Sequence, residues 1–266
     1  RAAEYRPDVA AWLMSPAPKS TEALPGPLQS RWIDAVDLPS RALDPSDIEA
    51  AVAAEVQSFQ AIFRERPRVV VPPTFVWTPV VEAAWARAGV ECVVTPGRRY
   101  ESRDAHGSPV AVGAPIRNGD RGPEGVTYLV RDDYFEPVRG HAAQRGLDAL
   151  AKKTMLGRPT LLETHRANFV GTDADPERSL LEIDTLLRRS LEHFPGLAFM
   201  SSEELARRLR DRDGDLVDTS MSRRLHVALR RLAEISRLRK LAIVTGAILV
   251  AWLLYALTWR GAGSSR

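Results

Sequence analysis

The sequence predicts an α/β fold with a mainly parallel sheet, followed by one transmembrane helix. Segments rich in β-branched residues alternate with segments of helical periodicity along most of the 266-residue chain, and strands that alternate with helices form parallel sheets. Near the C-terminus, residues 241–259 contain no charged side chain. Apolar residues make up 44% of the chain and charged residues 27%, which is typical of a globular protein and excludes a largely disordered one.

The expected strands are short and alternate with the expected helices. An Asp-Pro pair opens two of the helices, at Asp44 and Asp175, because Asp is a favoured N-cap and Pro a favoured first helical residue. Ser201 and Glu204 fit a capping box for the last helix. Residues 95–125, rich in Gly, Arg and Asp, are expected to form a long loop. The strands are expected at 68–72, 90–94, 126–131, 159–164 and 197–200. One helix is expected to start at Pro45, with an apolar face that includes Phe63, and the others at about 79–88, 141–155 and 176–193 and after Ser201.

The basic charge is concentrated at the C-terminal end of the chain. Residues 220–266 carry nine basic and one acidic side chain, a net charge of +8, whereas residues 1–219 have a net charge of −5. Because the folded part is slightly acidic, a nucleic-acid-binding domain is disfavoured. The single Cys92 excludes an internal disulfide framework and a multi-cysteine zinc site.

The charge-free run 241–259 predicts a single-pass membrane anchor, with a buried core helix as the alternative. At about 1.5 Å per residue it would span roughly 28 Å, close to the hydrocarbon thickness of a bilayer. The basic residues of the preceding segment place the N-terminal part in the cytoplasm by the positive-inside rule, and an export signal before Arg1 would instead place it on the periplasmic or extracellular side. The segment 216–240 is expected to be a basic helix or linker lying along anionic lipid, and 260–266 a short tail.

Polar side chains follow the expected strand 159–164, at the edge where parallel α/β folds place functional groups. Glu163, His165 and Asn168 lie there. A histidine at a strand end can act as a general acid or donate a hydrogen bond near neutral pH. The alternative is a histidine that only caps the loop.

Two further strand ends carry candidate residues. Acids after strand 126–131, next to Arg131, could orient a base or bind sugar hydroxyls, or form a salt-bridge cluster. Phe75 and Trp77 could form the wall of a sugar-binding pocket, or belong to the hydrophobic core. No glycine-rich nucleotide motif, P-loop or nucleophile elbow is present, and no two of the five histidines form a His-x-x-x-His pair.

Three segments taken together resemble bacterial polysaccharide deacetylase-like proteins of the glycoside hydrolase/deacetylase superfamily. These are VVVPPTFVWTPVVEAAWARAGV from Val69, YLVRDDYFEPV from Tyr128, and the stretch from Thr164 that begins THRANFVG and closes with FMSSEEL. The resemblance covers about residues 5–210. It implies a distorted seven-stranded (β/α) barrel over residues 1–215, incomplete at its N-terminus.

The resemblance also implies a reaction, the hydrolysis of acetyl groups on sugars. In this superfamily a divalent metal, zinc or similar, is held by one Asp and two His, a second Asp is the base and a late-strand His is the acid. His165 lies where the late histidine would be, and the segment from Pro73 to Trp77 where the substrate groove would be. The residues expected to be catalytic are His165, Asp133 and Glu136, and those expected to bind substrate are Trp77, Phe75, Arg131, Asn168 and Arg166.

The metal ligands of the superfamily have no counterpart in the chain. They should precede Val69, but residues 1–68 contain no histidine, and Asp8, Asp34 and Asp37 are weak substitutes. Either the ligand-bearing strands lie upstream of this sequence, or the chain is a non-catalytic homologue with no cofactor. The expected function is therefore a membrane-anchored hydrolase that deacetylates an envelope polysaccharide or its lipid-linked precursor. The alternatives are a saccharide-binding scaffold and, less favoured, a glycosidase that uses Asp133 and Glu136.

Overall fold

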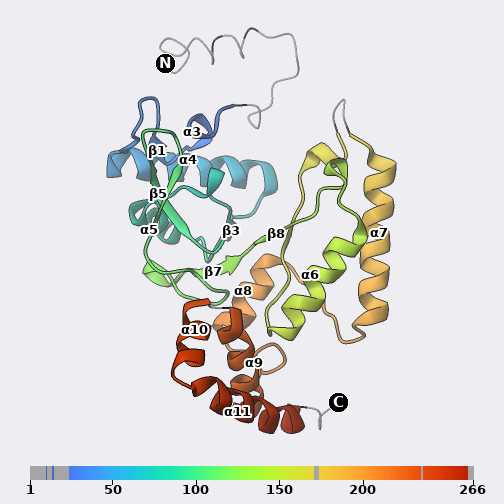
Figure 1. The fold of residues 1–266 in the computed structure, drawn as a ribbon. Helices are drawn as coiled ribbons and strands as arrows, with labels where there is room; N and C mark the ends of the chain where they lie inside the picture. Colours follow the sequence, from blue (N-terminus) through green and yellow to red (C-terminus); the bar gives the residue numbers. More distant parts are fainter. Residues whose placement is uncertain (1–9, 11–13, 15–23, 171–173, 235, 263–266) are drawn as a thin grey trace. The chain divides into compact units, whose positions relative to one another are not determined.

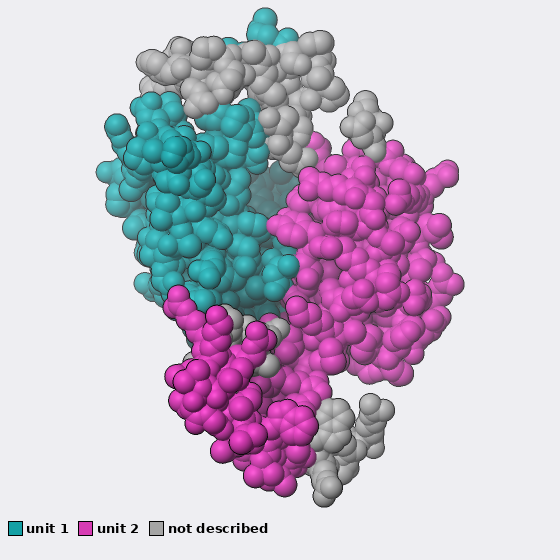
Figure 2. Space-filling view, viewed as in Figure 1, with its two compact units in different colours: residues 1–132, 200–207 teal, residues 133–199, 208–266 magenta. Residues whose placement is uncertain are grey.

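The computed structural model of the chain describes residues 10, 14, 24–170, 174–234 and 236–262 (Figure 1). The chain divides into two compact units, shown in different colours in Figure 2. Unit 1 comprises residues 1–132 and 200–207, and unit 2 comprises residues 133–199 and 208–266. The helices and strands of both units confirm the α/β class within the described residues.

A three-stranded parallel sheet forms the centre of unit 1. Its strands are β3 (Val69–Val70), β4 (Cys92–Thr95) and β7 (Thr127–Val130), in the order β3-β4-β7. Every residue of β4 and β7 is buried. This agrees with their unbroken apolar runs, since strands covered on both faces show no alternation of apolar and polar residues.

Two helices pack together in unit 1, α4 (Pro45–Phe63) and α5 (Pro79–Arg87). The predicted cap of α4 is confirmed, because Asp44 Oδ1 accepts a hydrogen bond from the Ser46 amide at 2.8 Å. The apolar residues of α4 and α5 meet those of the sheet in one core. The core contains Trp32, Ile48, Val52, Trp77, Val81, Trp85, Val90, Val93 and Val126.

The segment 95–125 is more structured than the expected loop. It contains an antiparallel hairpin of β5 (Arg99–Arg103) and β6 (Pro109–Val112), with a bulge between Tyr100 and Ser102. The composition of the segment conceals this hairpin because Gly and Asp dominate its turns. The smaller elements of unit 1 are α3 (Gly26–Gln29), β1 (Ile33–Asp34), β2 (Arg41–Ala42), η2 (Pro73–Phe75) and η3 (Pro123–Gly125).

A pair of helices beside two very short strands makes up the first part of unit 2. The strands β8 (Asp133–Tyr134) and β9 (Leu162–Glu163) are parallel, and Tyr134 pairs with Glu163. Helices α6 (Ala143–Met155) and α7 (Pro176–His193) run side by side (Figure 1). Gly146 permits their close approach, because a Cβ at this position would lie 2.8 Å from both methyl groups of Leu186. Two 3-10 turns, η4 (Pro137–Arg139) and η5 (Arg166–Asn168), follow the strands.

The expected barrel is wrong for the described part of the chain. Pairing between its strands is confined to four separate small sheets, of two or three strands each. A barrel requires an unbroken ring of paired strands. Residues 197–200, expected as the last strand, are irregular and lead into α8 (Ser202–Arg210), where the Glu204 amide donates to Ser201 Oγ at 3.1 Å.

The expected transmembrane helix and single-pass membrane localisation are also wrong. The apolar run is divided between α10 (Ser236–Val244) and α11 (Ala247–Ala262), and Gly246 between them has a left-handed φ of +73°. Helix α11 packs against α9 (Met221–Glu234), where the His226 and Tyr255 rings stack 4.4 Å apart. None of the helices in the described ranges combines the length and apolar character that a bilayer crossing requires.

Candidate functional site

Three polar side chains come together in unit 2 at the carboxyl ends of β8 and β9. Glu136 follows β8 by two residues, Glu163 is the last residue of β9, and His165 lies two residues beyond it. Because the two strands are parallel, their carboxyl ends share one edge. This is the edge at which open α/β sheets bind ligands.

His165 bridges two carboxylates. Its Nδ1 lies 2.6 Å from Glu136 Oε1, and its Nε2 lies 3.1 Å from Glu163 Oε1. Both glutamates are buried, whereas the His165 side chain is 45% exposed. A neutral imidazole donates from one nitrogen only, so when both glutamates are ionised, both contacts are hydrogen bonds only if the ring carries two protons. The arrangement can therefore hold a proton at Nε2 in a position that solvent reaches.

Asn168 fixes the position of Glu136. Its Nδ2 donates to Glu136 Oε2 at 2.6 Å, and its Oδ1 accepts from the Val138 amide at 3.0 Å. The side chain is fully buried, and the Ser179 hydroxyl donates to the Asn168 main-chain carbonyl at 2.8 Å. With Oε1 facing His165 and Oε2 facing Asn168, both oxygens of Glu136 are hydrogen-bonded, as a buried carboxylate requires.

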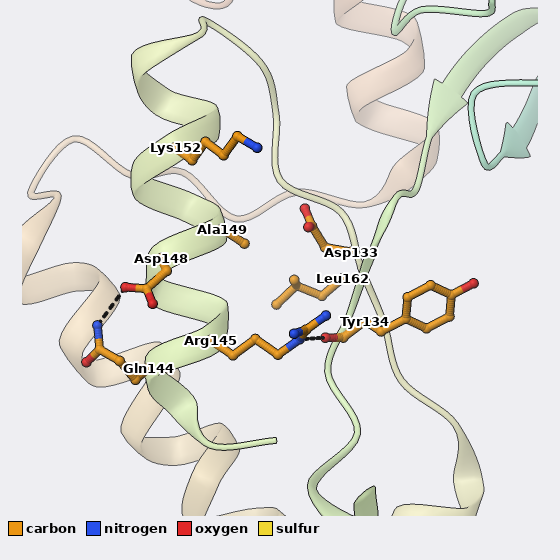
Figure 3. A pocket seen from close by; sticks show the side chains of 8 residues that line it. All are labelled: Asp133, Tyr134, Gln144, Arg145, Asp148, Ala149, Lys152 and Leu162. Carbon is orange, nitrogen blue, oxygen red and sulfur yellow. Dashed lines mark hydrogen bonds between the residues drawn. The ribbon is translucent and has the colours of Figure 1, made fainter. Parts of the chain in front are cut away.

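A polar cavity of about 470 Å³ lies between α6 and the two strands (Figure 3). Arg145 and Lys152 project from α6 toward the strands, while the Tyr134 ring points away from the helix. Arg145 Nε donates to the Tyr134 carbonyl at 3.0 Å. The lining residues are Asp133, Tyr134, Gln144, Arg145, Asp148, Ala149, Lys152 and Leu162. The volume is within the range of small-molecule sites, and its amides and charges suit a hydroxyl-rich ligand.

Of the residues expected to be catalytic, His165 and Glu136 are in contact with each other, whereas Asp133 pairs with a lysine instead. The Asp133 carboxylate lies 2.7 Å from the ammonium of the buried Lys153 and lines the polar cavity. Asn168, expected to bind substrate, instead holds Glu136. Glu163 is the residue missing from the expected set, although its place as a strand-end acid was visible in the sequence.

The other residues expected to bind substrate are dispersed. Trp77 is fully buried in the core of unit 1, where its Nε1 donates to Glu82 Oε2 at 2.9 Å, so it offers no surface to a ligand. Phe75 is half-buried, with the Arg131 guanidinium 5.6 Å from the centre of its ring. Arg166 is exposed in η5, directly after His165.

The residues of the site do not fit the metal that the resemblance implies. Across residues 24–170, 174–234 and 236–262, no three His, Cys, Asp or Glu side chains are grouped so as to hold a metal ion. Both nitrogens of His165 face carboxylates, and Nδ1 of His141, the second histidine beside Glu136, accepts a hydrogen bond from the Glu136 main-chain amide at 3.0 Å. We therefore derive no step through a metal.

Comparisons with known proteins identify no relative. No family model, curated protein or solved structure matches the chain.

Proposed function

We propose that unit 2 carries the acid–base centre of a carbohydrate-active hydrolase, in which His165 transfers the proton. The observation that supports this is the bridging of two buried carboxylates by a half-exposed imidazole. The proposed reaction is the removal of acetyl groups from an envelope polysaccharide or its lipid-linked precursor. The choice of an acetylated sugar depends on the resemblance of the segments around Trp77, Asp133 and His165 to polysaccharide deacetylases.

Each residue has a distinct task in this proposal. Glu136 accepts the Nδ1 proton at 2.6 Å and so directs Nε2 outward, and Asn168 holds Glu136 in place. The Nε2 contact with Glu163 is longer, 3.1 Å, and is the one that water or substrate can replace. Nε2 then takes a proton from the water that adds to the acetyl carbonyl, and returns it to the departing sugar nitrogen or oxygen.

A saccharide-binding protein without catalysis is the alternative. It is favoured by the fact that both nitrogens of His165 already contact carboxylates, so the cluster could serve structure alone. Only turnover distinguishes the two, because both predict a saccharide beside the same strands.

The test is the rate of acetate release from acetylated sugars and from p-nitrophenyl acetate by the His165→Ala variant. General acid–base catalysis contributes about 10²- to 10⁴-fold, so a loss of at least about 100-fold in kcat/KM is expected. His193→Ala is the matched control, because His193 is exposed and its Nδ1 contacts the Arg189 carbonyl of its own helix. An unchanged rate in His165→Ala would refute the assigned role. Saccharide binding without turnover in the wild type would favour the binding protein.

A further inference from the structure

A second cavity, apolar where the first is polar, lies beside the last turn of α6. It measures about 450 Å³, and it is formed by the end of α6 together with α9 and α11, all of unit 2. Its walls are Met155, Leu156, Leu229, Ile248, Ala251 and Trp252, with Tyr255, Lys152 and Arg230 completing the lining. We call it the apolar groove. The Trp252 side chain remains 72% exposed, so the groove is not closed off from ligands.

The two cations of the groove give it an electrostatic preference. Arg230 is held in place, because its Nε donates to the Tyr255 hydroxyl at 3.0 Å and its Nη1 to the Met155 carbonyl at 3.3 Å. Lys152 is exposed, and it shares the lining of the polar cavity with Asp133, whose carboxylate is paired with Lys153, and with Asp148. Among residues 219–266 the sequence has one acid, Glu234. An apolar groove with cations and few acids is complementary to an apolar chain that carries an anionic group.

Lys152 lines both cavities. Along α6, the polar cavity is lined by Gln144, Arg145, Asp148, Ala149 and Lys152. The apolar groove is lined by Lys152, Met155 and Leu156, the residue that follows the helix. At about 1.5 Å per residue, this lining extends roughly 18 Å along the helix. A ligand that used both cavities would therefore have a polar part, an anion near Lys152 and an apolar tail, in that order.

We infer that the two cavities bind one amphiphile, a lipid phosphate whose chain occupies the apolar groove, whose phosphate meets Lys152 and whose saccharide enters the polar cavity. The saccharide part depends on the proposed function, but the lipid-phosphate part does not. The inference narrows the substrate of the proposed hydrolase to a lipid-linked sugar. A substrate held by its lipid would keep its saccharide beside β8 and β9, the strands that carry the acid–base centre.

The test uses the full chain and decyl phosphate as the probe, below its critical micelle concentration, with titration calorimetry. Each buried methylene raises the affinity by about fourfold at most. Octyl phosphate has two fewer methylenes than decyl phosphate, so it should bind up to about 16-fold more weakly. Inorganic phosphate should not bind measurably. The Lys152→Ala substitution should weaken the binding of decyl phosphate by about tenfold. It should leave the affinity for the neutral decyl glucoside unchanged. Lys240→Ala is the control, since Lys240 is exposed on α10 and lines neither cavity.

A second pair of variants tests the groove itself. Ala251→Trp should fill it and abolish binding of both decyl ligands, whereas Ala256→Trp, on the same helix but outside the lining, should not. Equal binding by these two variants would overturn the inference. So would a dimer in light scattering that dissociates in Ala251→Trp, because the groove would then be covered by a second copy.

The outcomes separate this inference from the proposed function. Ala251→Trp should still hydrolyse p-nitrophenyl acetate, and His165→Ala should still bind decyl phosphate. Decyl phosphate binding without hydrolysis in the wild type would refute the hydrolase and retain the lipid-phosphate site. Hydrolysis by the wild type without decyl phosphate binding would refute the lipid-phosphate site and retain the hydrolase.

Discussion

Replacing Gly122 by Ala should strongly destabilise unit 1, because a buried carboxylate occupies the space that the new methyl group would need. The φ of Gly122 is −86°, so the backbone tolerates alanine and only the space is at issue. A Cβ at this position would overlap Glu82 Oε1 and lie 2.5 Å from the Tyr128 hydroxyl. Glu82 is fully buried and receives hydrogen bonds from Trp77 Nε1 at 2.9 Å and from the Tyr128 hydroxyl at 2.7 Å.

The magnitude follows from those bonds. The carboxylate must move to admit the methyl group, and each hydrogen bond to a charged group contributes about 1.5–3 kcal/mol. Loss of both hydrogen bonds costs about 3–6 kcal/mol. Alanine also lowers the conformational entropy of the unfolded chain, which stabilises the fold by about 0.4–1 kcal/mol. The free energy of unfolding should therefore fall by about 2–6 kcal/mol, a large part of the stability of a typical domain.

Cys92 provides the assay. It is the one cysteine of the chain, it is buried in β4, and burial raises the pKa of its thiol to about 12. A thiol reagent at neutral pH should therefore react only when unit 1 opens. When closing is faster than labelling, the rate follows the open population, so Gly122→Ala should label at least about 30-fold faster than the wild type, since about 1.4 kcal/mol is tenfold.

Gly196→Ala is the control, because a Cβ there would contact nothing within 4 Å. It should label at the wild-type rate. The reasoning would be refuted if Gly122→Ala labelled no more than about threefold faster than the wild type, which corresponds to less than about 1 kcal/mol. The Glu82 carboxylate would then move aside with little loss of stability.

Two further predictions concern pH. Hydrogen bonds from Ser46 lower the pKa of Asp44 below its usual 3.8, so the cap stabilises α4 above that pH and the stability is lost as pH falls through the lowered pKa. Asp44→Ala should thus lower the urea midpoint at pH 7 but not at pH 2, and an equal loss at both would contradict this account. Burial, and then Arg230, lowers the pKa of His226 from 6.5, so its contribution is present above pH 6.5 and is lost as pH falls through the lowered value. The protection factors of α11 amides, which are corrected for the intrinsic pH dependence of exchange, should fall between pH 7 and pH 5 in the wild type but not in His226→Phe. A fall that persists in the variant would show that another group causes it.

The sequence predicted best the elements that depend on neighbouring residues. Helix α7 has the expected bounds, Pro176–His193, and Asp175 Oδ1 accepts from the Arg178 amide as an N-cap should. Helix α4 likewise begins at Pro45, as expected, and it includes the expected apolar face up to Phe63. Caps are local, since the side chain and the amide it serves are two or three residues apart. The sequence therefore contains all that is needed to place them.

The errors share a cause, which is that composition does not reveal long-range packing. The run 241–259 has the hydropathy of a membrane span, but Thr245 and Gly246 separate two helices, and Tyr255 of the second stacks on His226 from α9. Trp77 follows a Pro-Pro turn as a pocket wall would, yet it is buried because Glu82 satisfies its indole N–H. Each outcome depends on a partner residue that hydropathy alone does not identify.

Solvent access distinguishes the hydrogen-bond network of Glu82 in unit 1 from that of Glu136 in unit 2. It determines which of the two is suited to proton transfer. Glu82 and Glu136 are both buried and both hold two hydrogen-bond partners. The hydrogen-bond partners of Glu82 are an indole and a phenol, and the Arg99 guanidinium lies 3.9 Å from its carboxylate. Burial, and then Glu82, raises the pKa of the Tyr128 hydroxyl. One partner of Glu136 is the imidazole of His165, which is 45% exposed and whose two nitrogens both face carboxylates. The first network therefore suits the stabilisation of unit 1, whereas the second connects a fixed buried carboxylate to solvent through an exposed imidazole, a group that can transfer a proton.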